Sequence, residues 1–182
     1  MRRQMEQGGF VGDQRVHFFP ALDYGMEWCE NMLLTKNEAS TQFIATSLAS
    51  QLARSFPHPE LVEALMGFLE RVEAEGGQTL MRRGEASDAM YFVESGRLNI
   101  ELETPDGDVI RLRSIRGGTV IGVMGLYLHQ PRTADVVTLQ PSVLYRLGAD
   151  ALMRMEAEQP QTAAALHEWI ALMLAERLSD NN

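Results

Sequence analysis

The sequence predicts an α+β fold in which a small antiparallel β-roll lies between N-terminal helices and two C-terminal helices. Two observations carry this prediction. Hydrophobic residues repeat at three- and four-residue spacing toward both ends of the chain, and short β-prone runs separated by turn residues fill the middle. The length of 182 residues suits one domain with appendages, and the 45% hydrophobic and 23% charged content is that of a folded globular chain.

The N-terminal part divides into two segments. Residues 1–18 are polar and contain glycine, so we expect a flexible tail there. Residues 19–57 are expected to form helices, because apolar residues recur at helical spacing from Ala21 to Phe56. Pro57 and Pro59 should end this pattern, since proline pushes the residue before it out of the helical region. A short helix from about Pro59 to Leu69 follows.

The predicted roll of eight strands spans residues 68–148. The clearest β-prone runs are Met90–Val93, Arg97–Glu103, Val109–Ile115, Asp135–Leu139 and Ser142–Leu147. Turn signals rich in Gly, Pro and Asp separate the runs, and Pro105-Asp106-Gly107 predicts the tip of a hairpin. Short strands at such close spacing favour an antiparallel barrel or roll.

The two C-terminal helices are expected within residues 149–178, with a break at Gln159-Pro160. Leu166, Ile170 and Met173 form an apolar stripe on the second of them. We expect a homodimer that uses this stripe and the N-terminal helical segment, although such a stripe is equally typical of ordinary core packing.

Residues 121–134, IGVMGLYLHQPRTA, interrupt the strand pattern with a Gly turn, a helix-sized segment and a Pro-Arg pair. A short helix after Gly122 would present free backbone N–H groups to an anion. Arg132 can donate two charge-assisted hydrogen bonds to a phosphate, and the Thr133 hydroxyl can add another donor. These residue types in this order favour a phosphate-binding site.

The same stretch resembles the phosphate-binding cassette of cyclic-nucleotide-binding domains, which reads F-G-E-x-A-L and then P-R-x-A. Gly122 and Leu126 stand at the family Gly and Leu, and residues 131–134 match the Pro-Arg end. Gly77–Leu80, Gly84 and Tyr91–Gly96 are similar to the family's upstream turns. The resemblance implies that residues 58–182 form a jelly-roll-like antiparallel double-stranded β-helix with helices. It also implies a regulatory, ligand-sensing domain that binds cyclic AMP, cyclic GMP or a related anion without another cofactor.

The resemblance also implies the site residues. The phosphate ligands would come from Gly122, Met124, Gly125, Leu126, Arg132 and Thr133, and Leu166 and Trp169 of the last helix would cover the base. Val123 departs from the pattern, because it stands where the family has the Glu that holds the ribose hydroxyl. Losing that charge-assisted bond costs about 1.5–3 kcal/mol, or roughly ten- to hundredfold in affinity. We therefore expect weak binding; the alternative is a vestigial pocket on an interaction module that regulates or dimerises with a partner.

A narrower resemblance concerns residues 22–30, LDYGMEWCE, which are similar to the end of the STAS domain of SulP-type anion transporters. Residues 118–137 are similar to the cyclic-nucleotide-binding-like domains of that group. This implies a STAS remnant within residues 19–57 and a membrane-transporter partner. The alternative for residues 21–34 is an amphipathic helix packed on the roll or on a second subunit.

Other classes fit poorly. No G-x-S-x-G, H-E-x-x-H or P-loop motif occurs, so we expect no enzyme. The four histidines, His17, His58, His129 and His167, are scattered, and Cys29 is the lone cysteine, so no metal site is expected. The net charge of −9 and the absence of a recognition helix after the last helix argue against DNA binding. Without a secretion signal or a membrane-spanning stretch, the expected location is cytoplasmic.

Overall fold

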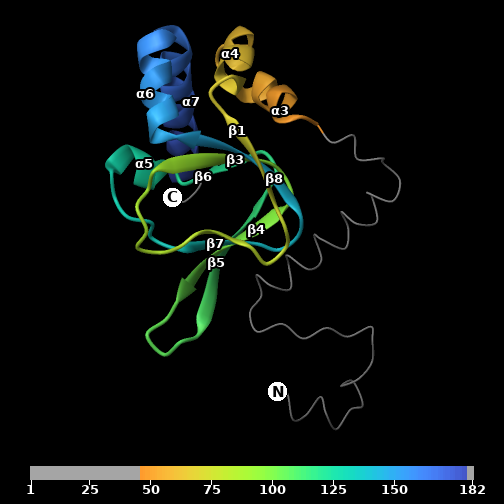
Figure 1. The fold of residues 1–182 in the computed structure, drawn as a ribbon, viewed down its shortest axis with the longest axis vertical. Coiled ribbons are helices and arrows are strands. Elements are labelled where there is room, and N and C mark those ends of the chain that lie inside the picture. The colour runs from red at the N-terminus through yellow and green to blue at the C-terminus, as the bar shows by residue number, and fades with distance from the viewer. Residues whose placement is uncertain (1–45, 180–182) are drawn as a thin grey trace, which may run out of the picture. The chain divides into compact units, whose positions relative to one another are not determined.

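The computed structural model describes residues 46–179, and the predicted tail and the helical pattern before residue 46 lie outside that range. In the described part, helices flank two antiparallel four-stranded sheets (Figure 1). The predicted α+β roll is therefore confirmed. None of the helices within residues 46–179 has both the length and the apolar content that crossing a membrane requires.

Three short helical elements precede the roll: α3 (Leu48–Ser55), the 3₁₀ helix η1 (Pro59–Leu61) and α4 (Val62–Met66). The Ser47 side chain caps α3 by accepting a hydrogen bond from the Ser50 N–H at 3.3 Å. The helix ends before Phe56, whose extended backbone precedes Pro57. The prolines thus end the helix where the sequence predicts, and η1 with α4 covers most of the predicted helix at 59–69.

The roll consists of two sheets with the strand orders β1-β8-β3-β6 and β2-β7-β4-β5. The strands are β1 (Glu70–Ala74), β2 (Thr79–Met81), β3 (Ala89–Ser95), β4 (Arg97–Glu103), β5 (Val109–Arg116), β6 (Thr119–Ile121), β7 (Asp135–Thr138) and β8 (Ser142–Gly148). Strands β4 and β5 extend from the roll as a hairpin (Figure 1). Its tip is the predicted Pro105-Asp106-Gly107 turn, closed by a 2.8 Å hydrogen bond from the Thr104 N–H to the Asp108 carbonyl.

Three of the strands, β1, β2 and β6, are not among the β-prone runs of the sequence. Strands β2 and β6 have three residues each, too few to display an alternating pattern. Strand β1 carries charged residues at three of its five positions and is defined by its partner, because Val72 pairs with Leu144 and Glu70 with Arg146 on β8. Long-range pairing therefore determines these three strands.

The core has two parts on opposite faces of the sheet that contains β3. Along β3, Met90 and Phe92 face the helices, whereas Val93 packs with residues of the second sheet. Both faces of this strand are covered, which explains why its apolar residues run almost without interruption. The cluster between the sheets also contains Leu98 and Ile115 from the β4–β5 hairpin.

The C-terminal helices are α6 (Ala149–Glu158) and α7 (Pro160–Ser179), with the predicted break at Gln159. Leu166 and Ile170 of the predicted dimer stripe are buried in the helical part of the core, and Met173 packs against it. The stripe therefore packs against the core of its own chain and does not present a free surface for a partner. The homodimer itself stays a prediction.

Candidate ligand-binding site

The stretch that the sequence singles out forms a tight turn followed by a short helix. Strand β6 leads into Gly122, which adopts a left-handed backbone with φ of 81° and immediately precedes helix α5 (Val123–Leu128). A Cβ at this position would lie 2.7 Å from Nη1 of Arg132 and 3.2 Å from the Ala89 carbonyl oxygen. Glycine is required both by the φ angle and by the close approach of the arginine.

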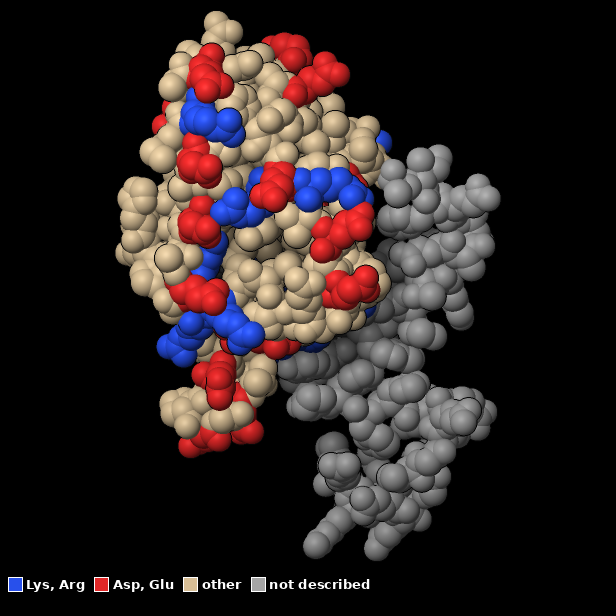
Figure 2. All heavy atoms as spheres, in the orientation of Figure 1, with Lys and Arg blue, Asp and Glu red and all other residues tan. Residues whose placement is uncertain are grey.

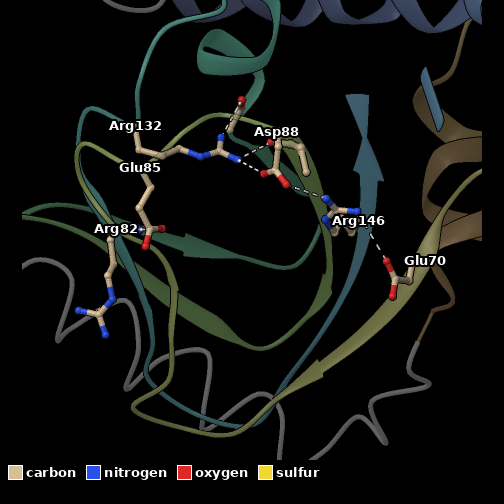
Figure 3. Close-up of polar contacts among 8 residues, drawn as sticks. Glu70, Arg82, Glu85, Asp88, Arg132 and Arg146 are labelled. Carbon is tan, nitrogen blue, oxygen red and sulfur yellow. Dashed lines mark hydrogen bonds and ion pairs between the residues drawn. The ribbon is translucent and has the colours of Figure 1, made fainter. Parts of the chain in front are cut away.

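Arg132 lies beneath this turn, and its side chain is only 6% exposed. Its guanidinium donates to the Ala89 carbonyl at 2.6 Å and to the Gly122 carbonyl at 3.2 Å. A carboxylate oxygen of Asp88 lies 3.9 Å from Nη2 of Arg132, so the two side chains form an ion pair but no hydrogen bond (Figure 3). Burial lowers the pKa of Arg132 below its ordinary value, and the nearby Asp88 carboxylate offsets part of that effect.

Asp88 is shared between two arginines. It accepts a hydrogen bond from Arg146 at 2.9 Å, and Arg146 lies 3.7 Å from Glu70 on β1 (Figure 3). Burial lowers the pKa of Arg146, but the hydrogen bond and charge of Asp88 together with Tyr91 outweigh this and raise the pKa overall. Because Asp88 is 66% exposed and is nearer to Arg146, it neutralises the buried charge of Arg132 only in part.

A cavity of about 370 Å³ opens next to the turn, within the size range of small-molecule sites. Six of the predicted site positions line it: Gly122, Val123, Met124, Gly125, Arg132 and Thr133. Its walls also include apolar side chains from both sheets, among them Met81 and Ile100 from one and Ile121 from the other. Among the described residues that line the cavity there is no Asp or Glu.

Two further arginines, which the sequence does not predict as site residues, line the same cavity. Arg113 comes from β5 and Arg177 from α7, where it stands one turn after Leu174, another lining residue. Arg177 donates a 3.3 Å hydrogen bond to the Val120 carbonyl of β6. Burial lowers the pKa of Arg177, and the positive charge of Arg113 lowers it further. The only sequence signal for this pair is their residue type.

Val123 is 3% exposed and is the first residue of α5. It lines the cavity and is also part of the core cluster beneath the helices. The position that the resemblance assigns to a ribose-binding carboxylate therefore carries an apolar, buried side chain at the cavity wall.

Three predicted site residues lie elsewhere. Leu126, Leu166 and Trp169 are absent from the cavity lining and belong to the core around the helices. Trp169 stacks on Phe92, with ring centroids 6.0 Å apart and an interplanar angle of 12°. Its ring is occupied by this packing, so in this structure it does not cover the cavity; the residues of α7 that line the cavity are Leu174 and Arg177.

Charges are mixed on one face of the described part of the chain. On the face shown in Figure 2, arginine and acidic side chains lie next to one another without forming a patch of one sign. Within residues 46–179, no group of three or more His, Cys, Asp or Glu side chains is arranged to hold a metal ion.

The described part of the chain thus combines a β-roll, a glycine turn, a short helix and a buried arginine beside a cavity. Residues 71–159 match the family model described as cyclic nucleotide-binding domain. This stretch, just under half of the chain, is therefore similar to the cyclic nucleotide-binding domain family.

Similar proteins place this domain in several contexts. Glutaminase 1 of Bradyrhizobium diazoefficiens is 29% identical over 91% of this chain and 26% of its own length. A CRP-like cAMP-activated global transcriptional regulator of Mycobacterium tuberculosis is 27% identical over 68% of this chain and 54% of its own length. The solved N-terminal domain of a Streptomyces coelicolor transcriptional regulator has 28% identity and a TM-score of 0.58, covering 65% of this chain and 84% of that domain. The chain thus spans about a quarter of the glutaminase and about half of the regulator.

Proposed function

We propose that this chain is a regulatory, ligand-sensing domain that binds a cyclic nucleotide or a related phosphate compound in the cavity beside α5. The observation that carries the proposal is Arg132, a buried cation at the wall of a cavity whose described lining contains no carboxylate.

The state of the Arg132 side chain favours an anionic ligand. A guanidinium has five N–H donors, and two hydrogen bonds from Arg132, to the Ala89 and Gly122 carbonyls, are formed within the described part of the chain. Burying a cation is costly unless a counter-charge is close, and Asp88 at 3.9 Å supplies this only partly. A phosphate oxygen in the cavity would complete both the hydrogen bonding and the charge balance.

Helix α5 contributes less positive charge at its N-terminus than a longer helix would. It has six residues, so few peptide dipoles add up at its N-terminus. The positive charge for an anion therefore comes from the arginine, and the turn contributes mainly by bringing the backbone close to it.

The test is titration calorimetry of the full chain with cyclic AMP, cyclic GMP and inorganic phosphate. Arg132→Gln removes the charge and should lower the affinity for all three ligands by roughly ten- to hundredfold, the value of a charge-assisted hydrogen bond. Arg132→Lys keeps the charge and should retain part of the binding. The matched control is Arg83→Gln, an exposed arginine outside the cavity lining, which should bind like the parent chain.

Thermal unfolding of each variant separates a lost ligand contact from a lost fold. If Arg132→Gln unfolds at the parent temperature and binds as tightly as the parent, the proposal is wrong. No binding of any of the three ligands by the parent chain would favour the second candidate, a vestigial-pocket interaction module. The buried Val123 at the ribose position is the observation that favours this candidate.

We propose no catalytic role for this chain, and we infer that it regulates a partner or a further part of a longer protein. The Bradyrhizobium glutaminase similarity covers about a quarter of that protein, so its activity is not transferred. A SulP-type transporter partner stays a prediction, because it depends on residues 22–30, which lie outside the described range.

A further inference from the structure

Arg113 and Arg177 reach the cavity from two elements that are far apart in the sequence. Arg113 lies on β5 of one sheet, and Arg177 lies near the end of α7. Both line the cavity that Arg132 also lines, and no described acidic side chain is part of that lining. The cavity wall therefore carries three positive charges.

The two arginines are close enough for the charge of Arg113 to act on Arg177. The charge of Arg113 lowers the pKa of Arg177 beyond the effect of burial. Like charges that face one cavity repel, and an anion between them would turn this repulsion into two attractions. The hydrogen bond from Arg177 to the Val120 carbonyl holds its guanidinium against β6.

The position of this pair differs from that of Arg132. Arg177 is bonded to the carbonyl of Val120, and Arg132 to the carbonyl of Gly122, two residues further along the chain. Two residues of extended chain span roughly 6–7 Å. The guanidinium groups of Arg177 and Arg132 are therefore anchored at different points of this segment.

We propose that Arg113 and Arg177 form a second anion-binding position in this cavity, and that the ligand class is an organic anion with two separate negative groups. One group binds at Arg132 and the other between Arg113 and Arg177, with the apolar wall enclosing the body of the molecule. This inference rests on the proposed function, because it concerns the same cavity.

Three adenine compounds test the inference. Adenosine 3′,5′-bisphosphate carries two separate phosphates, adenosine 5′-monophosphate carries one, and in cyclic AMP one phosphate joins both ribose oxygens. The base and sugar are the same in all three, so differences in affinity report the second group. We expect the bisphosphate to bind the full chain roughly tenfold or more tightly than either of the other two, the contribution of one further charge-assisted contact.

Variants locate the effect. Arg113→Gln and Arg177→Gln should each remove most of the preference for the bisphosphate, while the affinities for the two single-phosphate compounds change little. Arg177→Lys should keep part of the preference, because the charge remains. Arg54→Gln, an exposed arginine on α3 outside the cavity lining, controls for the general loss of a positive charge.

The outcomes distinguish this inference from the proposed function. If cyclic AMP or phosphate binds but the bisphosphate shows no preference, the second position is wrong and the proposed function stands. The same holds if Arg113→Gln and Arg177→Gln weaken all three compounds equally. If the parent chain binds none of the compounds and no phosphate, both proposals are overturned.

Discussion

Gly125 of α5 lies directly against the side chain of Ser87, which precedes β3. A Cβ added at Gly125 would fall 2.8 Å from Cβ of Ser87, closer than packed atoms tolerate, and would overlap its hydroxyl. The Ser87 hydroxyl is buried and forms no hydrogen bond within the described part of the chain. Gly125 stands where the family that this chain resembles has Ala. The Ser87 side chain therefore fills the space that the methyl group of an alanine would need.

This pair predicts that Gly125→Ala destabilises the chain although alanine is the better helix former. Overpacking of this kind costs about 1–3 kcal/mol. Ser87→Gly combined with Gly125→Ala should recover most of the loss, because the added methyl group then has space. Denaturant unfolding of the single and double variants measures the coupling; additive effects of the two substitutions would contradict the packing relationship.

Replacing Val123 tests the ribose position. Val123→Glu should raise the affinity for cyclic AMP by roughly ten- to hundredfold, since it supplies a charge-assisted acceptor at the cavity wall. It should also lower the free energy of unfolding by about 1–3 kcal/mol, because a carboxylate replaces a buried apolar side chain. Val123→Gln has similar size without the charge and is the matched control. Equal binding by both variants would mean that the ligand does not reach this position.

We predict that Trp169 stabilises the folded chain. It stacks on Phe92 and also contacts Phe56 at a centroid distance of 6.0 Å, so Trp169→Ala should lower the free energy of unfolding by about 3 kcal/mol. Leu172→Ala on the same helix is the control, because Leu172 is exposed and its loss should stay within about 0.5 kcal/mol. A large loss of ligand affinity in Trp169→Phe at unchanged stability would instead support a lid role.

Tyr127 links α5 to the C-terminal helices. Its hydroxyl lies 2.7 Å from Nδ1 of His167, and Nε2 of His167 lies 3.3 Å from Glu156. A neutral imidazole with its proton on Nε2 satisfies both contacts, with Tyr127 donating to Nδ1 and His167 donating to Glu156. Burial raises the pKa of Tyr127 from 10 to about 12, with a smaller contribution from the charge of Glu156.

The sign of the resulting pH dependence follows from that shift. Between pH 10 and about 12 the folded chain keeps the Tyr127 proton while the unfolded chain loses it, so this contribution to stability is complete below pH 10 and falls as the pH rises. Tyr127→Phe should remove this part of the alkaline loss. Unfolding curves of both chains across this range measure the difference; parallel pH profiles would show that Tyr127 does not contribute.

The sequence could predict the roll and the turn at Gly122 because both depend on local chemistry. Turn residues, the change from helical to alternating spacing, and the order Gly122 to Arg132 are properties of neighbouring positions. The strands β2 and β6 were not predicted, because three residues are too few to show a period. Strand β1 was not predicted because its pairing with β8 defines it.

Within the candidate site, the sequence by itself determined the cassette, because Gly122, Val123 and Arg132 lie within eleven consecutive positions. Only the tertiary structure decided which residues from β5 and α7 face the cavity. It brought Arg113 and Arg177 to the same wall and packed Trp169 against Phe92. A helical stripe specifies which residues share a face, whereas the packing of that face against the roll decides which of them reach the cavity.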